Sequence, residues 1–451
     1  MKYGIYKDDW GRLMSCKRFE LEVTTGLFKL VTPKSEDGRS EFEKDIGRVV
    51  FSQPYRRLAG KTQVHPFATV DFIHNRLTHS NEVAYASRSL GRMAARYIQD
   101  VRGDLPEGRT IEEIGWICQA AGSMHDMGNP PYGHAGESAI KAWAARNSDE
   151  LADVCGKSLL NDYLLFDGNA QAFRMACRPD MRETCYYKFT AASLGAMIKY
   201  PWETRHAKSV DGEKSTAFST EEPFLKELWH EFGVNDEYRH PLSYLTEAAD
   251  DICYRINDFE DAVIMGLMDS CEVKDLLLGG MNNDDYARYK DGTFSRVKAA
   301  SIGMLIVEFS KVFQYEYETI MDGKLKGDLR SRIDDRWGGV LERIKKKYDV
   351  IFSERKKVTS EIGAYGQIAS ILDKYLGLLS ELRGKERRSE ERPEFRKLSF
   401  LSQRLVTLAW GGETYYNAHR KDNMSWWGHA VMDYVVGMTD DYLHTVSGEF
   451  M

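Results

Sequence analysis

The sequence predicts an all-α protein with at most a small β-hairpin near its N-terminus. Only 11 prolines occur in 451 residues, and in most windows apolar residues recur at spacings of three and four, as in residues 82–98. That spacing places the apolar side chains on one face of a helix. Strand-like alternation is short and scattered, and residues 21–31 give the clearest example.

We expect three regions along the chain, an N-terminal segment of residues 1–45, a motif-rich region of residues 46–280 and a helical region of residues 281–451. The second boundary is expected where glycine, asparagine and aspartate residues interrupt the helical pattern, between residues 277 and 291. Residues 205–222 are polar and aperiodic, which predicts a mobile loop that could act as a lid.

The composition excludes several classes of protein. With 42% hydrophobic and 29% charged residues, the chain has the composition of a soluble globular protein. A formal net charge of -7 argues against a generally basic nucleic-acid binder. No stretch of about 18 apolar residues could span a membrane, and the first residues lack the apolar core of a signal peptide. Seven cysteines without a C-x-x-C pair suit reduced thiols, so we expect a cytoplasmic protein.

Residues 123–134 crowd chemically active groups together. His125 and Asp126 are adjacent, two prolines follow at 130 and 131, and His134 comes next. Neighbouring side chains on a helix point about 100° apart, so this pair can reach one cation only from near a helix end or a groove. Taken alone, the pair is better explained as a capped or salt-bridged structural pair.

Two distant segments change that interpretation. His79 stands at the start of a strongly helical stretch, and Asp250 and Asp251 lie inside an otherwise apolar helix. Burying an ionised carboxylate costs several kcal/mol unless a cation or hydrogen bonds compensate it. His79, His125, Asp126 and Asp250 together form an ordered H…HD…D pattern. Two nitrogen and two oxygen ligands suit Mn²⁺, Fe²⁺, Co²⁺, Ni²⁺ or Mg²⁺ with open water positions, rather than a closed structural zinc site. Open water positions indicate catalysis.

The pattern resembles the HD-domain phosphohydrolases, and the segments around it resemble the bacterial deoxyguanosine triphosphate triphosphohydrolase family in particular. The similar segments lie in family order over most of the chain, at residues 39–42, 45–48, 56–58, 61–64, 76–80, 125–134, 136–137, 199–201, 247–252, 433–434 and 437–440. The resemblance implies a mainly helical HD-domain fold. Residues 46–280 would then be the catalytic domain, and residues 281–451 would complete the active site and make oligomer contacts.

The resemblance implies that one divalent ion, Mn²⁺ or Mg²⁺ above the others, is held by His79, His125, Asp126 and Asp250. The family pattern A-D-x-[IL] matches residues 249–252, which selects Asp250 rather than Asp251 as the ligand.

The resemblance also gives His134 and Glu137 a catalytic role. Because a proline disfavours helix in the residue before it, the chain must turn between His125 and His134. A histidine turned back over the metal could protonate a leaving oxygen or orient the attacking water, and Glu137 could orient its ring. The alternative is that His134 merely caps a loop.

Seven further residues are expected to bind substrate. Tyr254 and Asp258 share a helical stripe with Asp250. The resemblance implies that Tyr254 packs against the deoxyribose and that Asp258 bonds a sugar hydroxyl or a nearby group. The full set, each member of which could instead be an ordinary core or surface residue, is Gln63, Val64, Arg76, Lys199, Tyr200, Tyr254 and Asp258. Gln63 and Val64 would line the sugar pocket. Arg76, Lys199 and Tyr200 would lie on the phosphate side.

The activity implied is hydrolysis of deoxynucleoside triphosphates, dGTP first, to a deoxynucleoside and inorganic triphosphate. The resemblance also implies a homo-oligomer, for example a hexamer, and an allosteric deoxynucleotide or single-stranded DNA effector. Two alternatives stay open, an HD phosphohydrolase for another nucleotide and a nucleotide-sensing regulatory protein with a residual metal site. Residues 67–72 and 205–222 agree less with the family, so base selectivity is open, as is the arginine expected from the C-terminal region.

Overall fold

A computed structural model describes residues 4, 6–22, 27–34, 37–67, 70–178, 188–389 and 392–450. Within these residues the regular structure is helical except for one antiparallel pair of strands, β1 (Arg18–Glu22) and β2 (Leu27–Val31), in which Arg18 pairs with Val31. The predicted all-α fold with a small N-terminal hairpin is therefore confirmed. Residues 23–26 and 68–69, and Cys185, lie outside the described residues.

Helices make up most of the described part of the chain. Up to residue 278 they are α1 (Lys7–Leu13), α2 (Glu41–Val50), α3 (Gln53–Arg57), α4 (Arg76–Arg96), α5 (Ile111–Met124), α6 (His134–Arg146), α7 (Ser148–Cys155), α8 (Lys157–Leu164), α9 (Gly168–Cys177), α10 (Ala191–Met197), α11 (Ala207–Val210), α12 (Glu222–Phe232), α13 (Pro241–Ile264) and α14 (Ser270–Leu278). Beyond it they are α15 (Asn283–Tyr289), α16 (Phe294–Tyr315), α17 (Tyr317–Met321), α18 (Asp335–Phe352), α19 (Arg355–Ser389), α20 (Phe400–Trp410), α21 (Glu413–His419), α22 (Met424–Val436) and α23 (Asp440–Glu449).

The ends of two helices place residues of the site. Helix α4 begins at Arg76 because the side chain of Asn75 accepts a hydrogen bond from the backbone N–H of Thr78, with the reciprocal bond of a capping box. His79 consequently lies on the first turn of α4. Helix α5 ends at Met124, so His125 follows its last turn. This is the helix-end position that the adjacent His125 and Asp126 require.

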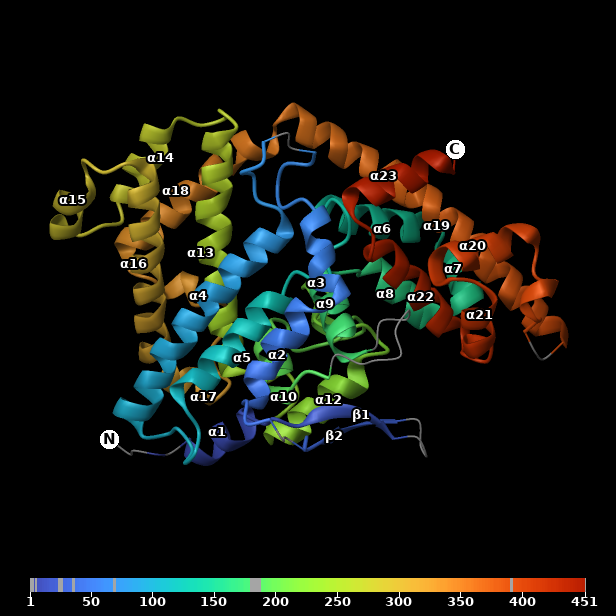
Figure 1. Ribbon diagram of the computed structural model, residues 1–451, viewed down its shortest axis with the longest axis horizontal. Coiled ribbons are helices and arrows are strands. Elements are labelled where there is room, and N and C mark those ends of the chain that lie inside the picture. Colours follow the sequence, from blue (N-terminus) through green and yellow to red (C-terminus); the bar gives the residue numbers. More distant parts are fainter. Residues whose placement is uncertain are drawn as a thin grey trace.

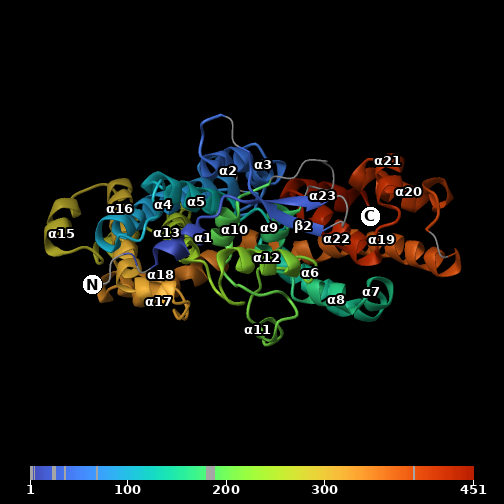
Figure 2. The same ribbon diagram turned by 90° about the horizontal axis from the view of Figure 1, so that it is seen from below.

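The core divides into two hydrophobic clusters. The first joins α1, α4, α5, α10, α12 and α13 to α16 and α18, and the second joins α6–α8 to α19–α23. In Figure 1 the helices that carry the first cluster lie at the left and centre, while α19 leads from the top of the molecule to the C-terminal helices on the right. The long axis is also plain in Figure 2, with α15 and α16 at one end and α20 and α21 at the other. The division at residues 45 and 280 stays a prediction.

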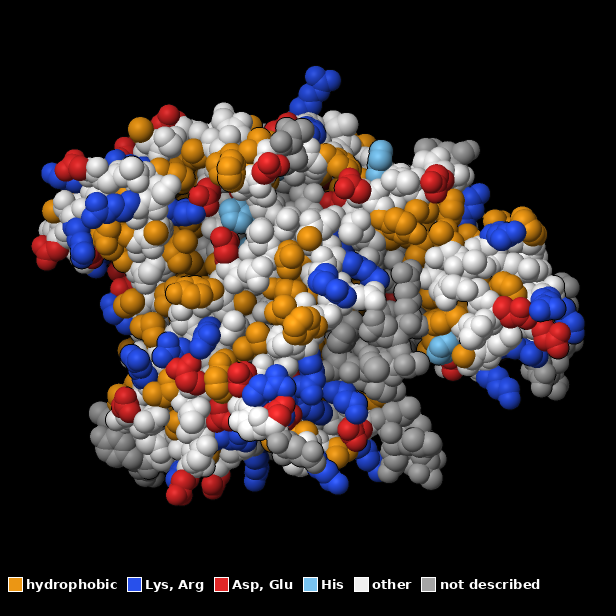
Figure 3. Space-filling model, viewed as in Figure 1, with side chains coloured by type: hydrophobic (Ala, Val, Ile, Leu, Met, Phe, Trp, Pro, Cys, Tyr) orange, Lys and Arg blue, Asp and Glu red, His pale blue; other side chains and the backbone are white. Residues whose placement is uncertain are grey.

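The surface carries both signs of charge. On the face drawn in Figure 3, lysines and arginines are interspersed with acidic side chains over most of the molecule. Among the helices in the described part of the chain, none combines the length and apolar character needed to cross a membrane.

Candidate metal centre and substrate pocket

One pocket of about 400 Å³ brings together segments that lie far apart in the sequence. A volume of this size falls within the range of small-molecule sites. Its walls come from residues 62–66, the starts of α4 and α6, the end of α5, the middle of α13, residues 197–214, and the 3-10 turn Arg330–Arg332 with the start of α19. Of the residues predicted to act, those that line the pocket are Gln63, Val64, Arg76, His79, His125, Asp126, His134, Glu137, Lys199, Tyr200, Asp250 and Tyr254.

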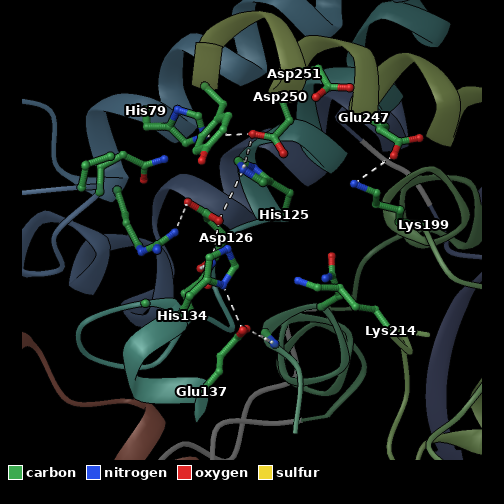
Figure 4. A pocket seen from close by; sticks show the side chains of 18 of the residues that line it. His79, His125, Asp126, His134, Glu137, Lys199, Lys214, Glu247, Asp250 and Asp251 are labelled. Atoms are coloured by element: carbon green, nitrogen blue, oxygen red, sulfur yellow. Dashed lines mark hydrogen bonds and ion pairs between the residues drawn. The ribbon is translucent and has the colours of Figure 1, made fainter. Parts of the chain in front are cut away.

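Two histidines and two aspartates gather at one end of this pocket (Figure 4). One ligand atom from each of His79, His125 and Asp126 lies within 4.8 Å of the other two. Asp250 reaches the same place from α13, with its Oδ1 atom 3.1 Å from Nε2 of His79 and 3.6 Å from Nε2 of His125. The second aspartate, Asp126, has its Oδ1 atom 3.5 Å from Nε2 of His125. The residues predicted as ligands are thus brought together.

The hydrogen bonds of His125 prepare it to bind a cation. Its Nδ1–H donates to the carbonyl of Gly122 at 2.7 Å, so the lone pair of Nε2 points toward the carboxylates. Among the described residues this buried Nε2 has no hydrogen-bond partner. Metal-binding histidines characteristically donate their other ring N–H to a carbonyl or carboxylate in this way. The residues present therefore fit a divalent ion.

The two clustered carboxylates are held in their charged form. Burial alone would raise the pKa of Asp250, but the electrostatic effect of the nearby His125 and His79 rings and the hydrogen bond with His79 lower it. Burial likewise opposes ionisation of Asp126, whose pKa is lowered by Arg76 and by the same two histidines. Arg76 donates from Nη1 to Oδ2 of Asp126 at 2.8 Å. Charged carboxylates are the form that binds a cation.

Asp251 has a different environment from Asp250. Its carboxylate lies 3.5 Å from Arg330 and 3.7 Å from Arg255, and it takes part in none of the contacts described above with the histidines. Burial raises the pKa of Asp251 to about 6, against the effect of the two arginines. The geometry favours Asp250 as the ligand, which is the choice made from the sequence pattern.

His134 and Glu137 lie on the first turn of α6 and contact each other. His134 Nδ1 is 3.0 Å from Oε2 of Glu137, and the side chain of His134 is 77% exposed, so the ring is open to the pocket. Glu137 is buried and accepts the backbone N–H of Gly168 at 2.8 Å. Burial would raise its pKa, but the hydrogen bond and charge of His134, then Lys214 and Gly168, lower it to about 2. A charged Glu137 can orient the ring of His134.

Two lysines stand on the opposite side of the pocket from Asp126 and His134 (Figure 4). Lys199 pairs with Glu247 at 2.9 Å, and Glu247 also accepts from Arg239 at 2.6 Å. Burial alone would lower the pKa of Lys199, but the charge of Glu247 outweighs burial and raises this pKa above its ordinary value. The ammonium is therefore charged. Lys214 lies 3.6 Å from Asp167. It belongs to residues 205–222, for which the sequence predicts a mobile loop that could act as a lid.

An aromatic stack forms the wall beyond the metal cluster. Tyr254 lies one helical turn after Asp250 and stacks on Tyr348, with ring centroids 5.3 Å apart. Tyr348 stacks in turn on Phe352 at 5.1 Å. Asp258 is not among the residues that line the pocket; its buried carboxyl accepts a hydrogen bond from the Tyr348 hydroxyl at 3.1 Å. Burial raises the pKa of Asp258 well above its ordinary value. In this structure Asp258 contacts the stack rather than the pocket.

Several lining residues escaped the sequence analysis. They include Asn129, Asn169, Lys214, Arg330, Phe352, Lys357 and Glu361. Arg330 is an arginine that the C-terminal region brings to the pocket. Lys357 and Glu361 form an ion pair at a spacing of four on the first turns of α19. That spacing was visible in the sequence, but such pairs are common on solvated helix faces and carry little information alone.

The chain is similar to known proteins with related names. A "deoxyguanosinetriphosphate triphosphohydrolase-like protein" of Pseudomonas aeruginosa (strain LESB58) is 34% identical over 98% of both chains. A protein of the same name from Listeria monocytogenes serovar 1/2a (strain ATCC BAA-679 / EGD-e) is 30% identical over 96% of this chain and 97% of its own. A "deoxyguanosinetriphosphate triphosphohydrolase" of Serratia proteamaculans (strain 568) is 35% identical over 49% of this chain and 50% of its own. No protein-family model matches. With near-complete coverage at this identity, the chain belongs to the deoxyguanosinetriphosphate triphosphohydrolase-like family.

Proposed function

We propose that this protein hydrolyses deoxynucleoside triphosphates, dGTP first, to a deoxynucleoside and inorganic triphosphate with the help of one divalent ion. The observation that carries the proposal is the meeting of His79, His125, Asp126 and Asp250 in a pocket that is also lined by three lysines and three arginines. Such a pocket offers cation ligands at one end and positive charge for a polyphosphate beside them. The names of the relatives agree with a hydrolase of this kind.

The metal would be held by the two histidines and two aspartates of the cluster, with Mn²⁺ or Mg²⁺ as the first candidates and Fe²⁺, Co²⁺ or Ni²⁺ as the others. When bound, a divalent ion supplies positive charge to phosphate oxygens and lowers the pKa of water near it. The unpaired Nε2 of His125 supports this assignment, since a buried imidazole nitrogen left without a partner among the described residues is costly.

The basic residues of the pocket would hold the triphosphate. Lys199 and Lys214 offer compact charges, and Arg76 offers the fork geometry that matches phosphate oxygens. Lys199 is tethered to Glu247 and Arg76 to Asp126, so both cations are fixed in place before substrate arrives. Fixed charges of this kind stabilise negative charge that grows on the phosphate during reaction.

His134 would handle the proton. Its Nδ1 faces Glu137, so Nε2 is left to face the substrate and can donate a proton to the departing 5′ oxygen or orient the attacking water. Glu137 stabilises the charged ring and fixes its orientation. No covalent intermediate is needed, because water is the nucleophile.

The aromatic wall supports a nucleoside on the far side of the metal cluster. Tyr254 would pack on the deoxyribose, where a 2′-hydroxyl would collide with it. Beyond it, Lys357 Nζ lies 5.2 Å from the centroid of the Phe352 ring and pairs with Glu361. Guanine presents two adjacent N–H donors, which a carboxylate such as Glu361 can accept together. This chemistry supports dGTP as the first substrate to test.

A hydrolysis panel tests the proposal. The purified protein is supplied with Mn²⁺ or Mg²⁺ and with each of the four deoxynucleoside triphosphates and GTP, singly and in mixtures. Release of nucleoside and of inorganic triphosphate is then followed by chromatography. We expect both products from dGTP in equal amounts. Release of monophosphate and pyrophosphate would indicate a different phosphohydrolase, and no turnover of any deoxynucleotide would overturn the proposal.

A further inference from the structure

A buried lysine and a buried aspartate connect the C-terminal helices to the pocket. Lys61 is 2% exposed, and its ammonium donates to the carbonyls of Asn129 and Val436, both at 2.6 Å. Asp440, the first residue of α23, is 4% exposed. Its Oδ1 atom accepts the backbone N–H of Tyr132 and its Oδ2 atom that of Thr62, both at 2.9 Å.

These bonds fasten a strained turn. Tyr132 has a backbone φ of 59°, in the left-handed region that residues other than glycine rarely adopt. Backbone held in such a region costs of the order of 1–3 kcal/mol and persists only where neighbouring groups impose it. Gly133 also has positive φ, and a Cβ atom there would lie 2.4 Å from Nη2 of Arg76. The Asp440 carboxylate binds the peptide N–H of the strained residue itself.

The fastened segments carry the residues assigned to chemistry. Two residues beyond Tyr132, His134 begins α6. Asn129, whose carbonyl binds Lys61, donates from Nδ2 to Oδ1 of Asp126 at 2.5 Å. On the other side, the carbonyl of Lys61 accepts the N–H of Arg76 at 3.0 Å, at the start of α4. The Asp440 carboxylate therefore binds the backbone of both Thr62 and Tyr132. The Lys61 ammonium links the first of these two segments to the second through the carbonyl of Asn129.

We propose that Asp440 and Lys61 are positioning residues that hold the turn of residues 129–133, and thereby His134, in its working place. The inference rests on the proposed function, since it concerns the reaction at that same pocket. Neither residue is among those that line the pocket, so neither is expected to touch substrate. A displacement of about 1 Å of a catalytic group can lower a rate by about 100-fold.

The test is the variant Asp440→Asn in the full-length protein. An asparagine amide can accept only one of the two N–H groups, and its own NH₂ faces the other. We expect kcat for dGTP to fall by about 10- to 100-fold. The KM for dGTP should change little. The dissociation constant for Mn²⁺, measured by calorimetry in the absence of substrate, should also change little. Asp441→Asn is the matched control, because Asp441 is exposed on the same first turn of α23 and its removal takes away the same charge. That control should behave as wild type.

Double variants separate positioning from general stability. In a His134→Ala background, Asp440→Asn should cause little further loss, because the group it positions is already gone. In a Lys199→Ala background it should lower the rate by the same factor as in wild type. An equal loss in all backgrounds, or wild-type kcat in folded Asp440→Asn, would overturn the inference. If Asp440→Asn does not fold, Lys61→Gln, which keeps N–H donors but loses the charge and is shorter, replaces it with the same expected pattern.

A second readout does not depend on turnover. Hydrogen exchange at the Tyr132 and Thr62 amides should be faster in Asp440→Asn than in wild type and unchanged in Asp441→Asn. Active wild type with unaltered exchange and kcat in Asp440→Asn would refute the positioning role alone. Wild type inactive on every nucleotide would refute the proposed function and the role of this contact in it, while exchange would still show whether Asp440 holds the turn.

Discussion

Nε2 of His79 lies 3.1 Å from Oδ1 of Asp250, a contact between residues 171 positions apart. It exists because α4 packs along α13, with the first turn of one helix against the middle of the other. The histidine is 2% exposed, and the carboxylate is one-third exposed toward the pocket. An ion at this place would therefore be reached from solvent on one side only.

The first prediction concerns metal affinity. Asp250→Ala should weaken binding of Mn²⁺ by more than the roughly 10- to 100-fold typical for loss of a residue that merely supports a ligand. Calorimetric titration of the protein without nucleotide measures the effect. Asp251→Ala is the matched control, since its carboxylate faces Arg330 and Arg255 instead. If both variants lost the same amount of Mn²⁺ affinity, the choice of Asp250 as the ligand would be wrong.

The second prediction concerns the Lys199–Glu247 pair. Glu247→Gln keeps the shape of the side chain but removes the charge that orients Lys199 and Arg239, so kcat/KM for dGTP should fall by about tenfold, which corresponds to about 1.4 kcal/mol. Steady-state kinetics give the value. Glu260→Gln on the same helix breaks a comparable ion pair with Lys298, and Glu260 is not among the pocket residues, so its activity should stay at the wild-type level.

Residue types and spacing predicted the fold class and favoured a metal cluster. Helical periodicity recurs within a few residues, and buried carboxylates in an apolar stripe need compensation wherever they are found. The choice between Asp250 and Asp251 needed the family pattern. The two residues are adjacent and of the same type, and Arg330, one of the two arginines that pair with Asp251, lies far along the sequence.

The remaining site residues depend on contacts that no local pattern encodes. Lys214 stands in a polar loop, and its approach to the pocket follows from tertiary bonds such as Trp202 Nε1 to the carbonyl of Lys214 at 2.7 Å. The bond from Thr62 to Asp440 spans 378 positions. Asp258 shares a helical stripe with Asp250, but it lies about two turns further along α13, where its carboxyl contacts Tyr348 and does not line the pocket.

The third prediction concerns the sugar. Tyr254→Ala should allow GTP to be hydrolysed and lower the preference for dGTP over GTP by about tenfold or more, because the ring that would meet a 2′-hydroxyl is removed. Competition assays with both nucleotides measure the ratio. Tyr348→Phe keeps the ring stack and loses only the hydroxyl bonded to Asp258, so it should keep the preference. An unchanged ratio in Tyr254→Ala would remove Tyr254 from sugar selection.

The last prediction concerns acid stability. His240 caps α13, accepting the N–H of Leu242 at Nδ1, and is 2% exposed. Burial lowers its pKa to about 4, against a hydrogen bond to the Leu13 carbonyl, while the unfolded chain keeps the ordinary 6.5. Between these values the unfolded state binds more protons, so stability should fall as the pH falls, by at most about 1.4 kcal/mol per pH unit from this residue.

His240→Asn keeps a capping oxygen and does not titrate. Urea unfolding should show a shallower pH dependence for this variant than for wild type or His230→Asn, whose histidine is exposed on α12. Parallel curves for all three proteins would mean that His240 is not the group responsible.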